Sequence, residues 1–133
     1  WLIQRINNMF DNANSGVYQI IVELHQNRTI IIGKLGSCVF RKGKYIYTGR
    51  AKKNLSQRID RHYKPNKKCF WHIDYFLSDE YVEIIDIIIK SDNFYDECIE
   101  NKKLIDNDAT IVIDKFGATD CVNECGTHLL LIN

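Results

Sequence analysis

Three segments of the sequence carry side chains that can take part in proton transfer and phosphate binding. The first segment is residues 16–18 (Gly-Val-Tyr), and the second is residues 45–49 (Tyr-Ile-Tyr-Thr-Gly). The third is residues 58–62, in which Arg58 precedes His62 by four positions. Cleavage of a phosphodiester needs a base that activates water, cations around the phosphate and usually a divalent metal. The residue types therefore favour hydrolysis of a nucleic acid as a hypothesis.

Charge is segregated along the chain, although the formal net charge is only +1. Residues 28–68 contain thirteen Lys and Arg against one acidic residue, Asp60, whereas residues 70–133 contain four Lys against fourteen acids. A basic block with apolar periodicity belongs to a folded surface, and such a surface suits a polyanion. The alternative is a solvated basic face that pairs with the acidic half of the same domain.

Composition places the chain among globular proteins. Its 133 residues, of which 45% are hydrophobic, predict a single domain over residues 1–133. No apolar stretch approaches the roughly 18 residues of a membrane span, and no secretory signal pattern is present. Five scattered cysteines, an odd number, indicate reduced thiols and a cytoplasmic protein.

The hydrophobic pattern predicts a mixed α+β fold, with a small antiparallel sheet flanked by helices. Strands are expected at residues 17–24, 29–32, 39–40, 45–47, 81–89 and 128–132, and helices at residues 1–10, 55–63, 70–77 and 94–105. The first two strands are expected to form a hairpin that continues as an antiparallel meander. In the helix at 55–63, the spacing places Leu55, Ile59 and Tyr63 on one side. Arg58, Arg61 and His62 fall on another side.

The sequence from Tyr47 to Ile59 resembles the Tyr-x-Gly-basic-Ala segment of nucleotide-excision-repair members of the GIY-YIG nuclease superfamily. The resemblance is closer to one branch of that superfamily and covers about residues 16–131. The shared segments, in order, are residues 33–36 (Gly-Lys-Leu-Gly), 58–62 (Arg-x-x-Arg-His), 71–75 (Trp-His-Ile-Asp-Tyr), 97–98 (Glu-Cys) and 116–121 (Phe-Gly-x-Thr-Asp-Cys). The separation of Tyr18 and Tyr47 is longer than in most members, which implies an inserted β-hairpin between the two motif strands.

The resemblance implies a metal-dependent site made by Tyr18, Tyr47, Arg58, His62 and Glu97. We expect Tyr47 to be the general base, Tyr18 to help orient water, and Arg58 to clamp phosphate in a bidentate geometry. A free tyrosine has a pKa of about 10, so nearby arginines or a metal must make its proton easier to remove. Glu97 is the expected protein ligand of Mg²⁺ or Mn²⁺. His62 is expected to contact phosphate or relay a proton.

Taken singly, these residues have ordinary explanations. Tyrosines in strands are common packing residues, Arg58 and His62 fit a basic helix face, and Glu97 is one acid among many. Their joint order is what favours a site.

Further residues are expected around the site. The predicted nucleic-acid contacts are Arg41, Arg50, Lys52, Lys53, Arg61, Lys67 and Lys68. His72 is a possible site-lining residue. Cys121, Cys125 and His128 have donor types that bind zinc, but their loose spacing favours buried reduced cysteines and a histidine at the edge of the core.

Three functional hypotheses follow. The first is a Mg²⁺- or Mn²⁺-dependent endonuclease that hydrolyses phosphodiester bonds in DNA, in repair or recombination. The second is a DNA- or RNA-binding module without catalysis, with salt-sensitive phosphate contacts. The third is a protein-interaction domain whose basic and acidic halves engage partners or self-associate. The sequence leaves open the choice of DNA or RNA, the shape of the substrate and the oligomeric state.

Overall fold

The computed structural model describes residues 14–64, 68–113, 116 and 127–132. The fold is mixed α+β, as the sequence predicts, with a five-stranded antiparallel sheet in the order β5-β1-β4-β7-β6 and a two-stranded sheet β2-β3. The strands are β1 (Gly16–Leu24), β2 (Arg28–Ile31), β3 (Ser37–Phe40), β4 (Gly43–Ala51), β5 (Val82–Ser91), β6 (Thr110–Ile111) and β7 (Leu129–Ile132). The helices are η1 (Gly33–Leu35), α2 (Leu55–Tyr63), α3 (His72–Leu77), η2 (Phe94–Asp96) and α4 (Glu97–Asp106).

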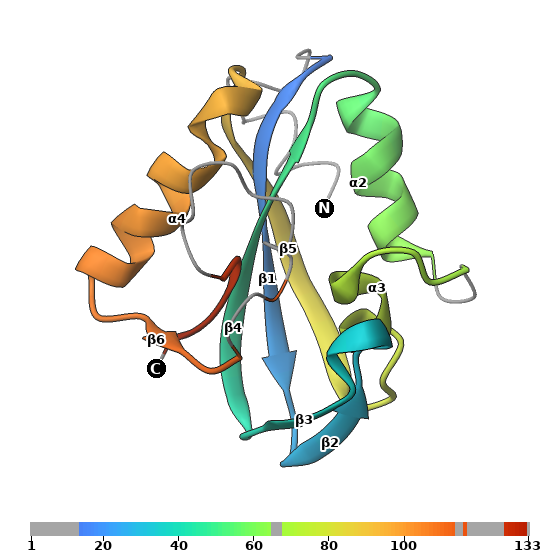
Figure 1. Cartoon of the computed structure of the whole chain (residues 1–133). Coiled ribbons are helices and arrows are strands. Elements are labelled where there is room, and N and C mark those ends of the chain that lie inside the picture. Colours follow the sequence, from blue (N-terminus) through green and yellow to red (C-terminus); the bar gives the residue numbers. More distant parts are fainter. Residues whose placement is uncertain (1–13, 65–67, 114–115, 117–126, 133) are drawn as a thin grey trace.

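Strands β1 and β4 form the centre of the large sheet, with helices on both of its faces. In Figure 1, α2 and α3 lie on one side of these strands and α4 lies on the other. Alternate residues of β1 from Tyr18 to Leu24 point into a core that also takes in Leu55 and Ile59 of α2 and Phe76 of α3. The sheet thus brings side chains of β1 and β4 close to α2.

The predicted inserted hairpin is present, but its pairing differs from the expected meander. Strand β2 pairs with β3, and together they form the small sheet between β1 and β4 in the sequence. Strand β1 pairs with β4 and β5 instead of β2. The prediction that residues 17–24 and 29–32 form a hairpin is therefore wrong, because both edges of β1 pair with strands that lie further along the sequence. Figure 1 shows the small sheet at one end of the large one.

Most predicted elements are confirmed with small changes in their ends. Helix α3 begins at His72 and not at Phe70, and the segment 94–105 divides into η2 and α4. The short strand β6 was not predicted. The helix expected at residues 1–10 lies outside the described residues. Across the described parts of the chain, every helix is too short or too polar to serve as a membrane span.

Candidate functional site

The two motif tyrosines lie together on one face of the sheet. Tyr18 on β1 is the register partner of Gly49 on β4, and Tyr47 lies two residues before that glycine. A Cβ atom on Gly49 would stand 2.7 Å from both Cζ and Oη of Tyr18 and 3.0 Å from Cε2 of Tyr47. Gly49 has no positive φ, so the glycine is needed for space. It allows both tyrosine rings to pack against the same stretch of backbone.

His62 joins this pair from α2. Its Nε2 lies 2.7 Å from the Oη of Tyr18, and both side chains are buried. The prediction that His62 lies on a different side of the helix from Leu55 and Ile59 is wrong. The buried face of α2 runs through Leu55, Ile59 and His62, at spacings of four and three residues. A direct contact between His62 and phosphate does not fit this burial, whereas a proton relay through Tyr18 does.

Arg58 occupies the same helix one turn earlier. Its Nη1 donates a hydrogen bond to the carbonyl oxygen of Arg50 at 2.8 Å, and its guanidinium lies 4.6 Å from the centre of the Trp71 ring. The positive charge of Arg58 acts to lower the pKa of both Tyr18 and Tyr47. Arg58 is therefore held at the tyrosines by the end of β4 and by the start of α3.

Glu97 reaches the group from α4, on the other side of the sheet. Its Oε1 lies 3.7 Å from Nε of Arg50 and its Oε2 lies 3.6 Å from Nδ1 of His128. The negative charge of Glu97 raises the pKa of Tyr18 and of Tyr47. Arg58 and Glu97 thus both act on the two tyrosines through their charges, and His62 joins these four residues by its contact with Tyr18.

Burial decides the protonation of the two tyrosines. Removal from water is the largest effect on both and raises the pKa of each phenol well above its ordinary value of 10.0. Arg58 acts in the expected direction, but it is outweighed by burial. Tyr18 and Tyr47 are therefore neutral phenols at neutral pH, and each can donate one hydrogen bond.

Two buried residues near Glu97 were not assigned to the site from the sequence. His128 was considered only as a zinc ligand, yet its Nδ1 faces Glu97 and its backbone N–H donates to Phe116 O at 2.8 Å. Asn101 lies one helical turn after Glu97, and its Nδ2 donates to Thr127 O at 2.6 Å. The spacing of four residues from Glu97 was the available signal for Asn101. Nothing in the sequence near His128 pointed to Glu97.

The cysteines differ in state. Cys38 and Cys69 are free thiols, whereas Cys98 is disulfide-bonded. The expectation that all cysteines are reduced is therefore wrong for Cys98. Cys121 and Cys125, which the zinc hypothesis requires, lie outside the described residues.

Arg61, one of the predicted nucleic-acid contacts, makes an internal ion pair. Its guanidinium donates to both carboxylate oxygens of buried Asp74, at 2.8 and 3.0 Å, and to Lys68 O at 2.8 Å. A bidentate pair of this kind fastens α2 to the start of α3. Arg61 is thus a structural residue, and the surplus of basic charge in the sequence did not reveal its partner.

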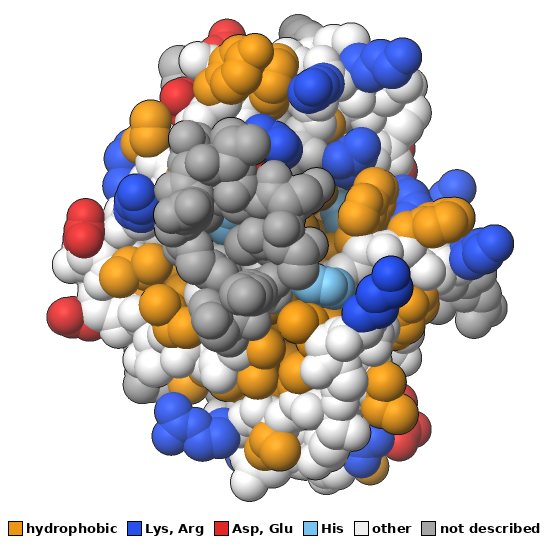
Figure 2. All heavy atoms as spheres, in the orientation of Figure 1, with side chains coloured by type: hydrophobic (Ala, Val, Ile, Leu, Met, Phe, Trp, Pro, Cys, Tyr) orange, Lys and Arg blue, Asp and Glu red, His pale blue; other side chains and the backbone are white. Residues whose placement is uncertain are grey.

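The other predicted contact residues take varied positions. Lys52 and Lys53 are exposed just after β4, and Arg50 is half-buried beside Glu97. Lys67 lies outside the described residues. Figure 2 shows Lys and Arg side chains over the α2 side of the molecule, interleaved with exposed hydrophobic side chains. A basic surface therefore borders the five-residue group.

His72 is linked to this group through the ring of Phe116. Its imidazole lies 5.6 Å from the ring centre of Phe116, which in turn lies 6.3 Å from that of Tyr47. His72 is therefore placed at the edge of the group.

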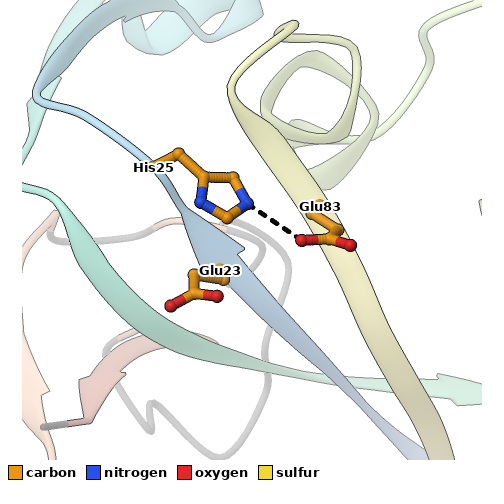
Figure 3. Close-up of side chains that lie close together, drawn as sticks. All are labelled: Glu23, His25 and Glu83. Carbon is orange, nitrogen blue, oxygen red and sulfur yellow. Dashed lines mark hydrogen bonds and ion pairs between the residues drawn. The ribbon is translucent and has the colours of Figure 1, made fainter.

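A second cluster of metal-ligating residue types lies at the other end of β1. Glu23, His25 and Glu83 have ligand atoms within 4.8 Å of one another, and His25 Nε2 is 2.9 Å from Glu83 Oε1 (Figure 3). Glu23 and Glu83 are direct partners in the β1–β5 register. The contact with His25 offsets the repulsion between two carboxylates on neighbouring strands, which accounts for the cluster without a metal.

Comparison with known proteins gives a family. The chain belongs to the family described as Domain of unknown function DUF123, whose model matches residues 17–133. All five residues of the group lie in the matched range. Neither the curated proteins nor the solved structures contain a match to the chain.

Proposed function

We propose that the protein is a metal-dependent endonuclease that hydrolyses phosphodiester bonds in nucleic acid, with DNA as the favoured substrate. The observation that carries the proposal is the convergence of Tyr18, Tyr47, Arg58, His62 and Glu97 from β1, β4, α2 and α4. Apart from Arg58 and His62, which share helix α2, these residues are far apart in the sequence. A packing role alone does not require a tyrosine, a histidine, an arginine and a glutamate to lie near one another. Their order also resembles that of GIY-YIG nucleases. A role in DNA repair or recombination belongs to the same proposal.

The contact between Tyr18 and His62 supports a change in the proposed roles of the tyrosines. From the sequence, Tyr47 was assigned as the general base. Tyr18, however, is a neutral phenol with a buried imidazole 2.7 Å from its hydroxyl, so it can pass its own proton to His62 while it takes one from water. In our proposal the proton of the attacking water ends on His62 by way of Tyr18, and Tyr47 orients that water.

Arg58 has the geometry for the phosphate clamp. Its guanidinium is held in place by Arg50 O and by the Trp71 ring, and a guanidinium can donate to two phosphate oxygens at once. Lys52 and Lys53, exposed after β4, extend the positive surface along which a nucleic-acid backbone would run.

The carboxylates near the tyrosines fit a magnesium or manganese ion bound by one protein ligand. Asp74 also acts on both tyrosines, but its carboxylate is held by Arg61 and by the backbone N–H groups of Phe70 and Trp71. Glu97 is the metal ligand in our proposal, and its carboxylate oxygens lie 3.7 Å from Arg50 Nε and 3.6 Å from His128 Nδ1. One carboxylate, with water and substrate oxygens, suits Mg²⁺. A bound divalent cation would stabilise the negative charge that develops on the phosphate oxygens.

A nucleic-acid-binding module without catalysis is the second candidate. It is favoured by the burial of Tyr18, Tyr47 and Glu97, which limits the access of substrate and keeps the tyrosines protonated. In that case the basic surface would bind phosphate and the buried group would only stabilise the fold.

The test is a cleavage assay on labelled duplex, single-stranded, flap and branched DNA, with Mg²⁺, Mn²⁺ or EDTA. The nuclease proposal expects products only with metal, and a rate about 10²- to 10⁴-fold lower for Tyr18→Phe, which removes the group that passes the proton to His62. Binding with a steep salt dependence, but no product from any DNA, would support the binding module instead. Cleavage by Tyr18→Phe at the wild-type rate would rule out the proposed role of Tyr18.

A further inference from the structure

An exposed aromatic pair with cations around it lies next to the candidate site. Phe70 is 68% exposed and Trp71 is 37% exposed. The ring of Phe70 has Lys68 Nζ 5.4 Å and the Arg61 guanidinium 5.8 Å from its centre. We refer to Phe70, Trp71 and Lys68 as the aromatic platform. Aromatic rings interleaved with cations are typical of protein surfaces that bind single-stranded nucleic acid.

The platform is held rigidly from beneath. The backbone N–H groups of Phe70 and Trp71 donate to Oδ2 of Asp74 at 2.9 and 3.0 Å, and Asp74 is fully buried. Arg61 holds the same carboxylate by two hydrogen bonds and lies 4.4 Å over the Trp71 ring. Phe70 therefore projects from an ordered backbone, which lowers the entropic cost of binding to it.

Trp71 connects the platform to the five residues of the candidate site. The Trp71 ring lies 6.1 Å from the His62 ring and 4.6 Å from the guanidinium of Arg58. His62 in turn contacts Tyr18. A nucleotide beside a phosphate at Arg58 would therefore have its base within reach of Phe70.

The rings of Phe70 and Trp71 differ in how much of their surface is free for a ligand. Trp71 has arginines close to its ring, so much of its surface is already in contact. Phe70 has only more distant cations and a larger exposed fraction. Of the two, Phe70 has the ring on which another flat group can stack.

We propose that the aromatic platform binds an unpaired nucleotide, with its base stacked on Phe70 and its phosphate near Lys68. This inference rests on the proposed function and names its substrate class: nucleic acid with an unpaired nucleotide next to the phosphate that is cut. A base inside a duplex is covered on both faces by its neighbours, so only an unpaired or unstacked base can lie on a protein ring. The surrounding positive charge suits a nucleic-acid strand better than an apolar protein partner.

The test compares two DNAs that differ only in an unpaired segment. A labelled duplex, and the same duplex with a 5′ single-stranded flap, are titrated with the full chain in EDTA, so that binding is measured without cleavage. One stacked base contributes about 1–3 kcal/mol. Wild type is therefore expected to bind the flap DNA about 5- to 150-fold more tightly than the duplex.

Variants of Phe70 distinguish stacking of a base on this ring from non-specific binding to the DNA backbone. Phe70→Ala is expected to lose the preference for the flap while keeping its affinity for the duplex, and Phe70→Trp is expected to retain the preference. Ile31→Ala is the matched control, because Ile31 is 67% exposed and lies on the β2–β3 sheet. An unchanged preference in Phe70→Ala, or an equal loss on both DNAs, would overturn the inference.

The two proposals can fail separately. If wild type cleaves DNA with metal but Phe70→Ala keeps the flap preference, the platform is wrong and the nuclease proposal stands. If wild type prefers the flap through Phe70 but no DNA is cut, the platform stands as part of a binding module. If wild type binds neither DNA, both proposals fail.

Discussion

Replacement of Gly49 by alanine tests whether the two tyrosines share a confined space. The new Cβ would lie 2.7 Å from Cζ and Oη of Tyr18, whereas carbon atoms pack at about 3.5–4.0 Å. A shift of roughly 1 Å is therefore required. The Tyr18 ring cannot move freely, because it is buried and its hydroxyl is 2.7 Å from His62 Nε2.

The expected cost can be estimated from these contacts. Overpacking of a buried position costs about 1–3 kcal/mol, and loss of the hydrogen bond to His62 adds about 1 kcal/mol. Alanine would otherwise stabilise the chain by about 0.4–1 kcal/mol, through a smaller entropy of the unfolded state. Since the steric cost is larger, we expect Gly49→Ala to lower the free energy of unfolding by about 2 kcal/mol.

Urea denaturation of the wild type and Gly49→Ala measures this loss. In the background of Tyr18→Leu, which has no atom at the position of Cζ, the same substitution should cost less, so the double-mutant cycle should show coupling. A Gly49→Ala protein as stable as the wild type, or more stable, would refute the account of Tyr18 and Tyr47, because it would mean that space exists between the strands and the rings.

Three other predictions concern charge and protonation. Burial alone would raise the pKa of Asp74, but hydrogen bonds from Arg61, Trp71 and Phe70 leave that pKa below its ordinary value of 3.8. The stability that Asp74 contributes is thus full above about pH 4 and is lost as pH falls through its lower pKa in the folded state. Asp74→Asn should cost on the order of 3 kcal/mol at pH 7, and its urea midpoint should fall less than that of the wild type as the pH is lowered. Because burial raises the pKa of Tyr18 and Tyr47 above 10.0, the stability that these phenols contribute is full below pH 10 and is lost as pH rises through their pKa values in the folded state. An alkaline titration of the urea midpoint should therefore show a smaller loss of stability in Tyr47→Phe than in the wild type, and equal losses in the two proteins would contradict the raised pKa of Tyr47. Finally, if Lys52 contacts phosphate, Lys52→Ala should reduce the slope of log affinity against log salt by about 0.9 on duplex DNA, and an unchanged slope in an anisotropy titration would exclude the contact.

The sequence predicts strands and helices here better than it predicts which strands pair. The alternation in residues 17–24 identified β1, but a period of two residues marks one strand and not its neighbours. The nearest strand in sequence was taken as the partner of β1, whereas β4 and β5 occupy its edges. The unbroken apolar run Ile20-Ile21-Val22 was the sign of a central strand that the hairpin interpretation did not use.

The residues of the candidate site were predicted through a resemblance, but the contacts and charges around them could not be predicted from the sequence. Whether His62 or Tyr63 faces the core depends on the partner that each meets, and the Tyr18 hydroxyl is 44 positions away in the chain. The pairing of Arg61 with Asp74 and the approach of His128 to Glu97 are likewise contacts between separate elements. Counts of charge along the sequence do not contain this information, so basic residues with internal partners were grouped with those on the surface.

The central claim is that Glu97 belongs to a metal-dependent phosphodiesterase site, and one comparison on helix α4 tests it most directly. Glu97 and Glu100 are 9% and 7% exposed, and Glu100 pairs with Lys103 at 2.8 Å, so Glu100→Gln is a matched control for Glu97→Gln. Single-turnover cleavage of DNA with Mg²⁺ should fall about 10²-fold or more in Glu97→Gln, with DNA binding retained, while Glu100→Gln cuts at the wild-type rate. Cleavage by Glu97→Gln at the wild-type rate, or an equal loss in both variants, would contradict the claim.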